Sequence, residues 1–475
     1  MIIFLRKLFY AIPILPQFYH LMWAWLGAVV YCFPSRQIFV LGVTGTKGKS
    51  TVLELISFTL ERAGFKVAML SSTKIKVSGE VEENLTENTM PGRFFIQRFL
   101  RRAVDAGCKY ALVEVTSEGV AANRHRFIDW DAAMFLNLHP EHIERHGSFE
   151  VYRNAKLKFF EYVASKQIPN SKQIPNSKFK NFFINKDDEN AGFFIEAARG
   201  TSDVPSVIPS EPRTRSGGSR GISMRDVSDS DEISRHESNS ATQARDDDRV
   251  ILFSKSSLPS KLIGEFNKYN VGAAVAFAES QGVDGKIIGT AVVEFPGLPG
   301  RMEYIQREPF SVVVDYAHTP DSLRSVYDTL RNSDQFPVAS DQSVTSDQRL
   351  KKLICVLGSA GGGRDKWKRP EMGKIAAEYC DEIILTNEDP YDEQPEKIIN
   401  GIFSGCSQTR NPKPETRKII DRKEAIEKAI SLAKPGDTVV ITGKGSEKFI
   451  HIANGKKIPW SDRDVVSRLC TGRNE

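Results

Sequence analysis

The sequence predicts an α/β fold made of two units, each a mostly parallel sheet covered by helices on both faces. Short apolar runs alternate with amphipathic segments over residues 37–160 and again from residue 300 onward. Such alternation is typical of parallel strands joined by crossover helices. The chain has 475 residues, with 40% hydrophobic and 26% charged residues. These values fit a globular enzyme of about two to four domains.

Each predicted element follows from a local pattern of apolar residues and turn formers. In the first unit, strands are expected at 38–41, 66–70, 110–115 and 132–136, and helices at 52–62 and 94–106. In the second unit, strands are expected at 311–315, 353–357, 382–386 and 438–442, and helices at 322–330, 370–379, 396–401 and 421–433. Two such units facing each other would form a cleft at the carboxyl ends of their strands.

Composition divides the chain further. We expect an apolar helical segment at 1–36, a central domain at 37–298 and a C-terminal domain at 299–475. Insertions are expected at 165–178, which repeats Ser-Lys-Gln-Ile-Pro-Asn exactly, at 199–249 and at 332–350. Residues 201–249 contain eleven Ser, seven Arg, no Lys and no aromatic residue, a composition that predicts disorder. This segment is either a passive insertion or a tail for phosphorylation or nucleic-acid binding.

The N-terminal segment is apolar, and three interpretations stay open for it. Its longest apolar run, from Phe18 to Phe33, is about 16 residues, short of the roughly 20 that span a bilayer. The alternatives are a helix packed on the domain, a helix lying in a membrane interface, and a true span. No clear cleavage site marks a signal peptide.

The most informative motif runs from Gly42 to Thr51, directly after the first predicted strand. It reads Gly-Val-Thr-Gly-Thr-Lys-Gly-Lys-Ser-Thr, in which a glycine-rich turn leads into a helix. Backbone N–H groups and a helix N-terminus at such a turn bind phosphate oxygens. Lys49 would reach the terminal phosphates and the Ser50 hydroxyl would ligate Mg²⁺. The strict G-x-x-x-x-G-K-[ST] pattern is not met, because its first glycine falls on Val43.

Three further features would meet at this edge of the sheet. Glu114 ends a predicted strand, where a Mg²⁺ ligand belongs. A cluster of three histidines lies between His139 and His146, although its spacing is not a zinc signature. Lys156 lies on an amphipathic helix and, by itself, would be an ordinary solvated lysine.

Charge and cysteines narrow the function classes. With 65 basic and 60 acidic residues, the net charge of +5 gives no strong preference for polyanions. The six cysteines lack metal-binding spacing, and we expect reduced thiols in a cytosolic protein.

These motifs resemble the Mur ligase family, ATP-dependent enzymes that form amide bonds in peptidoglycan precursors, and above all its UDP-N-acetylmuramoyl-tripeptide synthetase branch. Besides the glycine-rich turn, the resemblance rests on sequences spread in family order over both units. They are Val113–Ser117, Glu141-His142, His146-Gly147, Ala155-Lys156, Asn185–Asp188, Phe266–Asn270, Gly300–Glu303, Asp315–Asp321, Gly362–Pro370 and Gly443–Glu447.

The resemblance implies a P-loop-type central domain, a Rossmann-like C-terminal domain and a role for each matching residue. The implied catalytic residues are Lys49, Glu114, His142 and Lys156. The implied ATP-binding residues are Gly45, Thr46, Lys47, Gly48, Lys49, Ser50, Thr51, Asn270, Arg301 and Asp315. The implied ligands of two Mg²⁺ ions are Ser50, Glu114, His142 and a carbamylated Lys156. The implied substrate-binding residues are Thr89, Ser117, Arg124, Arg364, Asp389, Gly443 and Glu447.

Two departures from the family matter. About 36 residues precede the first strand, so the usual N-terminal domain that grips the UDP group is expected to be missing. The branch that adds meso-diaminopimelate carries Asp-Asn-Pro-Arg, whereas this chain has Glu388-Asp389-Pro390-Tyr391. With Tyr391 in the arginine position, bidentate recognition of a distal carboxylate is lost.

The resemblance therefore implies a monomeric ligase that adds an amino acid to UDP-MurNAc-L-Ala-D-Glu with ATP and Mg²⁺. We expect it in the cytoplasm, with membrane association as the alternative. Its expected partners are a nucleotide-sugar peptide and a free amino acid, with peripheral membrane contact through residues 1–33 and no nucleic acid. The alternatives are a Mur-type ligase on another carboxylate acceptor, such as a folylpolyglutamate-, cyanophycin- or lipid-linked-like substrate, and a non-enzymatic binding module.

Overall fold

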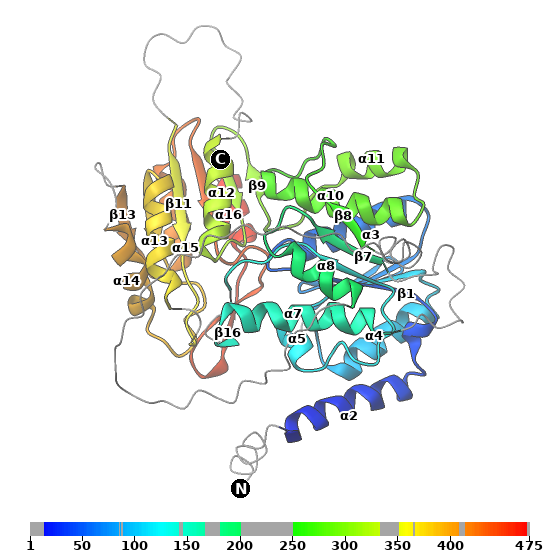
Figure 1. Cartoon of the computed structure of the whole chain (residues 1–475). Helices are drawn as coiled ribbons and strands as arrows, with labels where there is room; N and C mark the ends of the chain where they lie inside the picture. The colour runs from blue at the N-terminus through cyan, green and yellow to red at the C-terminus, as the bar shows by residue number, and fades with distance from the viewer. Residues whose placement is uncertain are drawn as a thin grey trace, which may run out of the picture.

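The computed structural model describes residues 14–84, 86, 89–141, 146–166, 181–200, 250–332, 351–363, 366–407 and 414–472. It contains two large sheets, each sandwiched between helices, which lie side by side in Figure 1. The predicted α/β architecture with parallel sheets is confirmed.

The larger sheet has the strand order β4-β3-β2-β5-β1-β6-β7-β8. Its strands are parallel except for the antiparallel β2-β3-β4 edge. The bounds are β1 Phe39–Thr44, β2 Val67–Leu70, β3 Lys74–Val77, β4 Glu80–Glu83, β5 Tyr110–Glu114, β6 Ala132–Phe135, β7 Asn181–Asn185 and β8 Val250–Phe253.

Successive side chains of these strands enter opposite cores. Phe39, Leu41 and Val43 of β1 pack under α3 (Lys49–Arg62), α10 (Glu265–Ser280) and α11 (Gly285–Glu294). Val40 packs on the other face with α4 (Arg93–Asp105), α7 (Phe149–Ala164) and α8 (Ala191–Arg199). All six residues of β1 are buried, as expected of a strand covered on both faces.

The second sheet has the order β13-β12-β11-β14-β10-β9, in which only β9 is antiparallel. Its strands are β9 Glu303–Gln306, β10 Ser311–Val314, β11 Leu353–Leu357, β12 Glu382–Leu385, β13 Glu415–Lys418 and β14 Thr438–Ile441. One face is covered by α12 Pro320–Asn332, α13 Lys368–Tyr379 and α14 Pro395–Cys406. The other is covered by α15 Arg422–Leu432 and α16 Asp462–Thr471.

Smaller elements complete the described chain. They are α2 Ile14–Val30, α5 Ser117–Ala121, the 3₁₀ turns η1 Pro34–Arg36 and η2 Ala453–Gly455, and the β15–β16 hairpin of Phe449–His451 and Lys457–Pro459. α2 packs on α4 at the outer side of the first sheet, at the bottom of Figure 1. None of the helices in the described part of the chain has both the length and the hydropathy that crossing a bilayer requires.

Three predicted boundaries need correction. The helix expected at 396–401 extends over Pro395–Cys406. Two insertions start later than expected, because Arg199 still belongs to α8 and Asn332 to α12. The remaining residues of the three insertions, 167–178, 201–249 and 333–350, lie outside the described residues.

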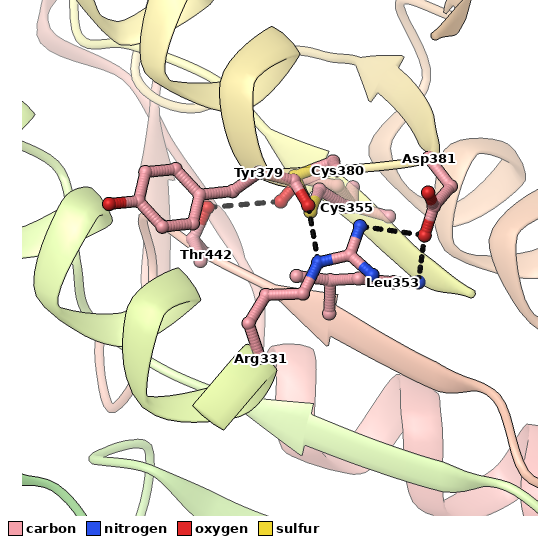
Figure 2. Close-up of a disulfide and its surroundings, with 8 residues drawn as sticks. Arg331, Leu353, Cys355, Tyr379, Cys380, Asp381 and Thr442 are labelled. Atoms are coloured by element: carbon pink, nitrogen blue, oxygen red, sulfur yellow. Dashed lines mark hydrogen bonds and ion pairs between the residues drawn. A yellow bond between two sulfur atoms is a disulfide. The ribbon is translucent and has the colours of Figure 1, made fainter. Parts of the chain in front are cut away.

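The cysteine prediction is wrong for one pair. Cys355 in β11 and Cys380 at the end of α13 form a disulfide across 25 residues of sequence, shown in Figure 2. Beside it, Arg331 bonds the Tyr379 carbonyl at 2.6 Å and the Asp381 carboxylate at 2.7 Å. Sequence spacing could not reveal this pair, because only the packing of α13 on the sheet brings the two residues together.

Candidate active site

The glycine-rich turn lies between β1 and α3, where the order of strands reverses from β5 on one side to β6 on the other. Ligands of open α/β sheets bind at such switch points. Gly48 caps α3 with φ +84°, and a Cβ there would lie 2.3 Å from Asn270 Oδ1. The turn therefore requires glycine at this position, and it leads directly into the N-terminus of a 14-residue helix.

Lys49 is folded back over the turn. Its Nζ donates to the carbonyl oxygens of Gly45 at 2.9 Å and Thr46 at 3.0 Å, and lies 3.9 Å from Glu114 Oε1. Burial lowers the pKa of Lys49, while the carboxylate of Glu114 opposes this change. A cation held over the loop in this way is available to the anionic end of a bound triphosphate.

Ser50 and Glu114 meet on the other side of Lys49. The parallel register pairs Glu114 with Val43, which brings its carboxylate to the start of the loop. Ser50 Oγ donates to Glu114 Oε2 at 3.2 Å, and the Ser72 N–H donates to the same oxygen at 2.9 Å. A hydroxyl and a buried carboxylate are the hard oxygen ligands that Mg²⁺ prefers, so this pair fits the ion.

Lys156 is the unexpected member of this cluster. Instead of facing solvent, its side chain is 2% exposed and its Nζ donates to Gly45 O at 2.9 Å. The ring of Tyr152 lies 4.8 Å from the same nitrogen. Burial, followed by the charge of Lys49, holds the pKa of Lys156 well below its usual value. A buried lysine at a phosphate loop whose amine is readily neutral is chemically distinct from a surface lysine.

Asn137, at the end of β6, fixes the loop from the opposite side. Its side-chain oxygen accepts from Thr46 N at 3.1 Å and Lys47 N at 2.9 Å, and its Nδ2 donates to Lys47 O at 3.1 Å. Thr46 Oγ1 is also 3.1 Å from Tyr152 OH. The residues predicted to bind ATP at this point form one continuous segment, in which Gly45, Thr46, Lys47 and Gly48 make the turn and Lys49, Ser50 and Thr51 begin α3.

The predicted nucleotide-binding residues outside the turn come from both sheets. Asn270 on α10 lies against Gly48 and donates to Asn267 Oδ1 at 2.8 Å. Asp315 ends β10, where its two oxygens accept from Met302 N and Ala317 N, each at 2.7 Å. Burial raises the pKa of Asp315, and the nearby charge of Arg301 opposes the rise.

The two units touch through Glu141. Its Oε1 accepts from Lys47 Nζ at 3.0 Å and lies 3.4 Å from Nε2 of His318 in the second unit. Burial, followed by the charge of Lys47, lowers the pKa of His318 to about 3, so the ring is neutral near pH 7. Arg301, whose guanidinium lies 4.1 Å from the centre of the Tyr316 ring, contributes to the positive field at Lys49.

The residues predicted on the acceptor side lie around α5 and the start of α4. Ser117 Oγ is 3.1 Å from His146 Nε2. Arg124 donates to the carbonyl of Met90, the residue after Thr89. These contacts bring the predicted residues Thr89, Ser117 and Arg124 to one region of the first unit.

The residues predicted on the amino-acid side follow β12 and β14 in the second unit. The fully buried Lys444 donates to Asp389 Oδ1 at 2.8 Å and also to Glu447. Burial lowers and the two carboxylates raise the pKa of Lys444, with a net rise. Tyr316 OH donates to Glu447 Oε1 at 2.9 Å, which connects this cluster to the loop after β10.

Glu388 and Tyr391 shape the same region. Burial, followed by the charge of Asp389, raises the pKa of Glu388 to about 7. A Cβ on Gly443 would lie 2.4 Å from Glu388 Oε2, so glycine is needed for this close approach. Tyr391 stacks on His451 with ring centres 5.1 Å apart. At the position where the sequence analysis noted the loss of an arginine, the structure therefore has a tyrosine ring that stacks on a histidine.

Two predicted residues, His142 and Arg364, lie outside the described residues. Within the described part of the chain, no group of three His, Cys, Asp or Glu residues could hold a metal ion. The predicted ligands that the structure does describe are Ser50, Glu114 and Lys156, and they lie around Lys49 and Gly45.

Sequence reasoning missed several polar residues that complete the site. They are Asn137, Glu141, Tyr152, Tyr316, His318 and Lys444. Most lie in the loops that follow β6, β10 and β14, which was the available signal, whereas Tyr152 lies on α7. Only their partners on other strands reveal their roles.

Comparison with known proteins agrees with this geometry. Residues 43–278 match the Mur ligase middle domain, and residues 300–445 match the Mur ligase, glutamate ligase domain. The chain is 34% identical over 452 residues to UDP-N-acetylmuramoyl-L-alanyl-D-glutamate--2,6-diaminopimelate ligase of Syntrophomonas wolfei, covering 95% of this chain and 82% of the relative. It is 32% identical to UDP-N-acetylmuramyl-tripeptide synthetase of Roseiflexus, covering 93% and 80%.

Solved structures show the same fold. A UDP-N-acetylmuramoyl-L-alanyl-D-glutamate--2,6-diaminopimelate ligase matches with a TM-score of 0.53 and 25% identity, covering 92% of this chain and 79% of that one. Folylpolyglutamate synthase of Mycobacterium tuberculosis matches with a TM-score of 0.60 and 15% identity, covering 89% and 92%.

Fold and site together define an ATP-dependent ligase that forms amide bonds. The chain belongs to the Mur ligase family.

Proposed function

We propose that this ligase adds an amino acid to UDP-MurNAc-L-Ala-D-Glu, a step in the synthesis of peptidoglycan precursors. The observation that carries the proposal is the cluster of Lys49, Ser50, Glu114 and Lys156 around the phosphate loop, in a chain that spans most of the tripeptide synthetases it resembles. The acceptor itself is inferred from the names of those relatives.

The chemistry must overcome repulsion between two anions. A carboxylate oxygen of the acceptor attacks the γ-phosphorus of ATP, which gives an acyl phosphate and ADP. Lys49 and Lys47 neutralise charge on the phosphates, and Asn137 keeps the loop in place. Bound Mg²⁺, held by Ser50 and Glu114, would supply further charge neutralisation. The amine of the amino acid then attacks the acyl carbon, and phosphate leaves.

Lys156 completes this site as a carbamate. Its neutral amine would attack CO₂, forming an N–C bond and releasing one proton. The product replaces a cation by an anionic oxygen ligand, which suits a Mg²⁺ site as an ammonium group does not. The lowered pKa of Lys156 and the absence of a carboxylate partner for it among the described residues support this proposal. His142 is proposed to ligate a second ion.

The remaining contacts come from both units. We assign Asn270 to the adenine, Asp315 to the ribose and Arg301 to the phosphates. Asp389, Gly443, Glu447 and Arg364 are assigned to the amino acid, and Thr89, Ser117 and Arg124 to the muramyl peptide. Tyr391 replaces the arginine of the diaminopimelate branch. We therefore propose no single amino acid, and both a Lys-type and another amino acid are candidates.

A second candidate is the same reaction on another carboxylate acceptor. The apolar helix α2 favours it, because this helix lies against α4 beside the region assigned to the acceptor. In both cases the nucleotide chemistry is identical, and only the acceptor differs.

The test is phosphate release from ATP and Mg²⁺ by the purified protein. UDP-MurNAc-L-Ala-D-Glu would be offered with lysine, meso-diaminopimelate or ornithine, and products identified by mass. We expect release only when the acceptor and one amino acid are both present. ATP binding without release in any combination would overturn the proposed acceptor and favour the second candidate.

A further inference from the structure

Helix α2 has two apolar faces, of which the described part of the chain covers only one. Ala24 and Ala28 are at most 1% exposed, and a Cβ on Gly27 would lie 3.4 Å from the Phe94 backbone. The Trp23 and Phe94 rings meet edge to face with centres 5.5 Å apart. Small residues thus let α2 approach α4 closely, and this face is fixed on the domain.

The opposite face is exposed and equally apolar. Met22 is 41% exposed, Trp25 49%, Val29 38% and Val30 55%, and Leu21 lies beside them at 38%. Residues 22, 25 and 29 follow the spacing of one helical stripe. Apolar patches of this kind on a folded protein mark a contact with another molecule or a membrane.

The charged residues near α2 indicate which kind of partner this face would bind. The first acidic residue of the chain is Glu54, while Arg6, Lys7 and Arg36 precede it; of these, Arg36 is ion-paired with Asp129 at 3.2 Å. Residues 1–13, outside the described part of the chain, are apolar or uncharged apart from Arg6 and Lys7. Arg98 on the neighbouring helix α4 is exposed. An apolar surface with basic neighbours and aromatic side chains suits the interface of an anionic bilayer.

The dimensions of α2 decide how it would meet a bilayer. Its 17 residues span about 25 Å, less than the roughly 30 Å of a hydrocarbon core. One face is also committed to α4, so lipid could not surround the helix. The contact with α4 favours a helix lying flat along the headgroups.

We propose that the exposed face of α2 docks the protein on an anionic lipid surface. Figure 1 places α2 at the outer edge of the first unit, away from the second sheet. Docking there leaves the second unit free. The region proposed for the acceptor is close to the membrane, since the charges of Arg93 and Arg124 act on His20 of α2.

The test is sedimentation of the full chain with phosphatidylcholine vesicles, with and without about a quarter phosphatidylglycerol. We expect binding to the anionic vesicles that weakens in high salt. The double variant Trp25→Glu/Val29→Glu should lower the partition coefficient about tenfold or more. Leu252→Glu/Val293→Glu is the matched control, because these residues are also exposed apolar side chains, on β8 and α11.

Thermal melting and nucleotide binding would show that both variants fold. Equal vesicle binding by the two double variants would overturn the proposal, as would no binding by the unchanged chain. Concentration-dependent dimers that only Trp25→Glu/Val29→Glu abolishes, without vesicle binding, would assign the face to a second copy instead. The assay uses no substrate, so its failure is distinguishable from failure of the proposed reaction.

Discussion

Lys156 shows how the environment of one residue sets its chemistry. On sequence alone it belongs to an amphipathic helix and resembles a solvated lysine. In the fold it is buried beside Lys49, donates to a loop carbonyl, and has a lowered pKa. Such a group is costly to keep charged, and conversion to a carbamate would replace the cation by an anion that a bound Mg²⁺ could neutralise.

At this scale we expect Lys156→Ala to abolish turnover, by on the order of 10³-fold, because a ligand for charge neutralisation is lost. ATP affinity measured by calorimetry should change little, because Lys49 and the loop amides remain. Small carboxylates such as acetate should restore part of the activity. A fully active alanine variant would remove the carbamate from the mechanism.

Sequence reasoning at the residue scale succeeded where a motif carries its own chemistry. Lys49, Ser50 and Glu114 lie together as expected, because loop and strand ends define their positions. Glu141 and His318 could not be paired in advance, because they lie 177 positions apart in the sequence and follow strands of two separate sheets. Tyr391 was noted as a replaced arginine, but its stacking on His451 depends on the β15–β16 hairpin.

At the scale of elements, the turn from β1 to α3 is the part that the fold can vary least. Gly48 has both a left-handed backbone and a close neighbour, Asn270, whereas Gly64 after the same helix has φ +83° and nothing within 4 Å of its added Cβ. A substitution at Gly64 therefore tests backbone strain alone, whereas a substitution at Gly48 tests strain together with steric crowding.

We expect Gly48→Ala to weaken ATP binding at least about tenfold, because both strain of roughly 1–2 kcal/mol and displacement of Asn270 act on the loop. Gly64→Ala should lower the melting temperature to a similar degree through strain alone and leave ATP affinity unchanged. Fluorescent-nucleotide titration of both variants checks this. Equal losses of affinity would show that Asn270 plays no part.

Several elements with a strong apolar pattern were predicted to within a few residues, but the strands β7 and β8 and the helices α10 and α11 were not predicted. β11 has the expected bounds, Leu353–Leu357, and β12 and β14 differ by one residue. The β3–β4 hairpin was missed because its strands, Lys-Ile-Lys-Val and Glu-Val-Glu-Glu, are short and half exposed. β9 and β13 were not predicted for the same reason, because both are edge strands without a buried residue.

At the scale of the whole molecule, the site is complete only when both units contribute. Arg301 in the second unit adds to the field at Lys49 in the first. Its guanidinium stacks on Tyr316 at 4.1 Å, and Arg307 stacks on Tyr304 at 4.0 Å in the same way. Both arginines make the same kind of contact with a tyrosine ring and differ in their position, so Arg307 is a suitable control for Arg301.

We expect Arg301→Ala to raise the Kd for ATP by about 10- to 100-fold, since a charge-assisted contact contributes about 1.5–3 kcal/mol. Arg307→Ala should leave the Kd within about twofold, because its charge does not act on Lys49. Calorimetric titration measures both. Weakening by both variants alike would indicate loss of folding of the second unit rather than loss of a phosphate contact.

The two sheets could be predicted because parallel strands produce continuous apolar runs. The contact between the units could not, because Glu141, Lys47 and His318 come from distant segments and carry no periodic pattern. The disulfide between Cys355 and Cys380 is a second case in which packing alone makes the pair.

The central claim is that the acceptor carboxylate attacks ATP and forms an acyl phosphate. Its most direct test uses acceptor labelled with ¹⁸O in the reacting carboxylate, with mass analysis of the phosphate released. The account predicts about one ¹⁸O in phosphate for each amide bond formed, because the attacking oxygen leaves with the phosphate. Unlabelled phosphate, formed alongside the amide product, would contradict it.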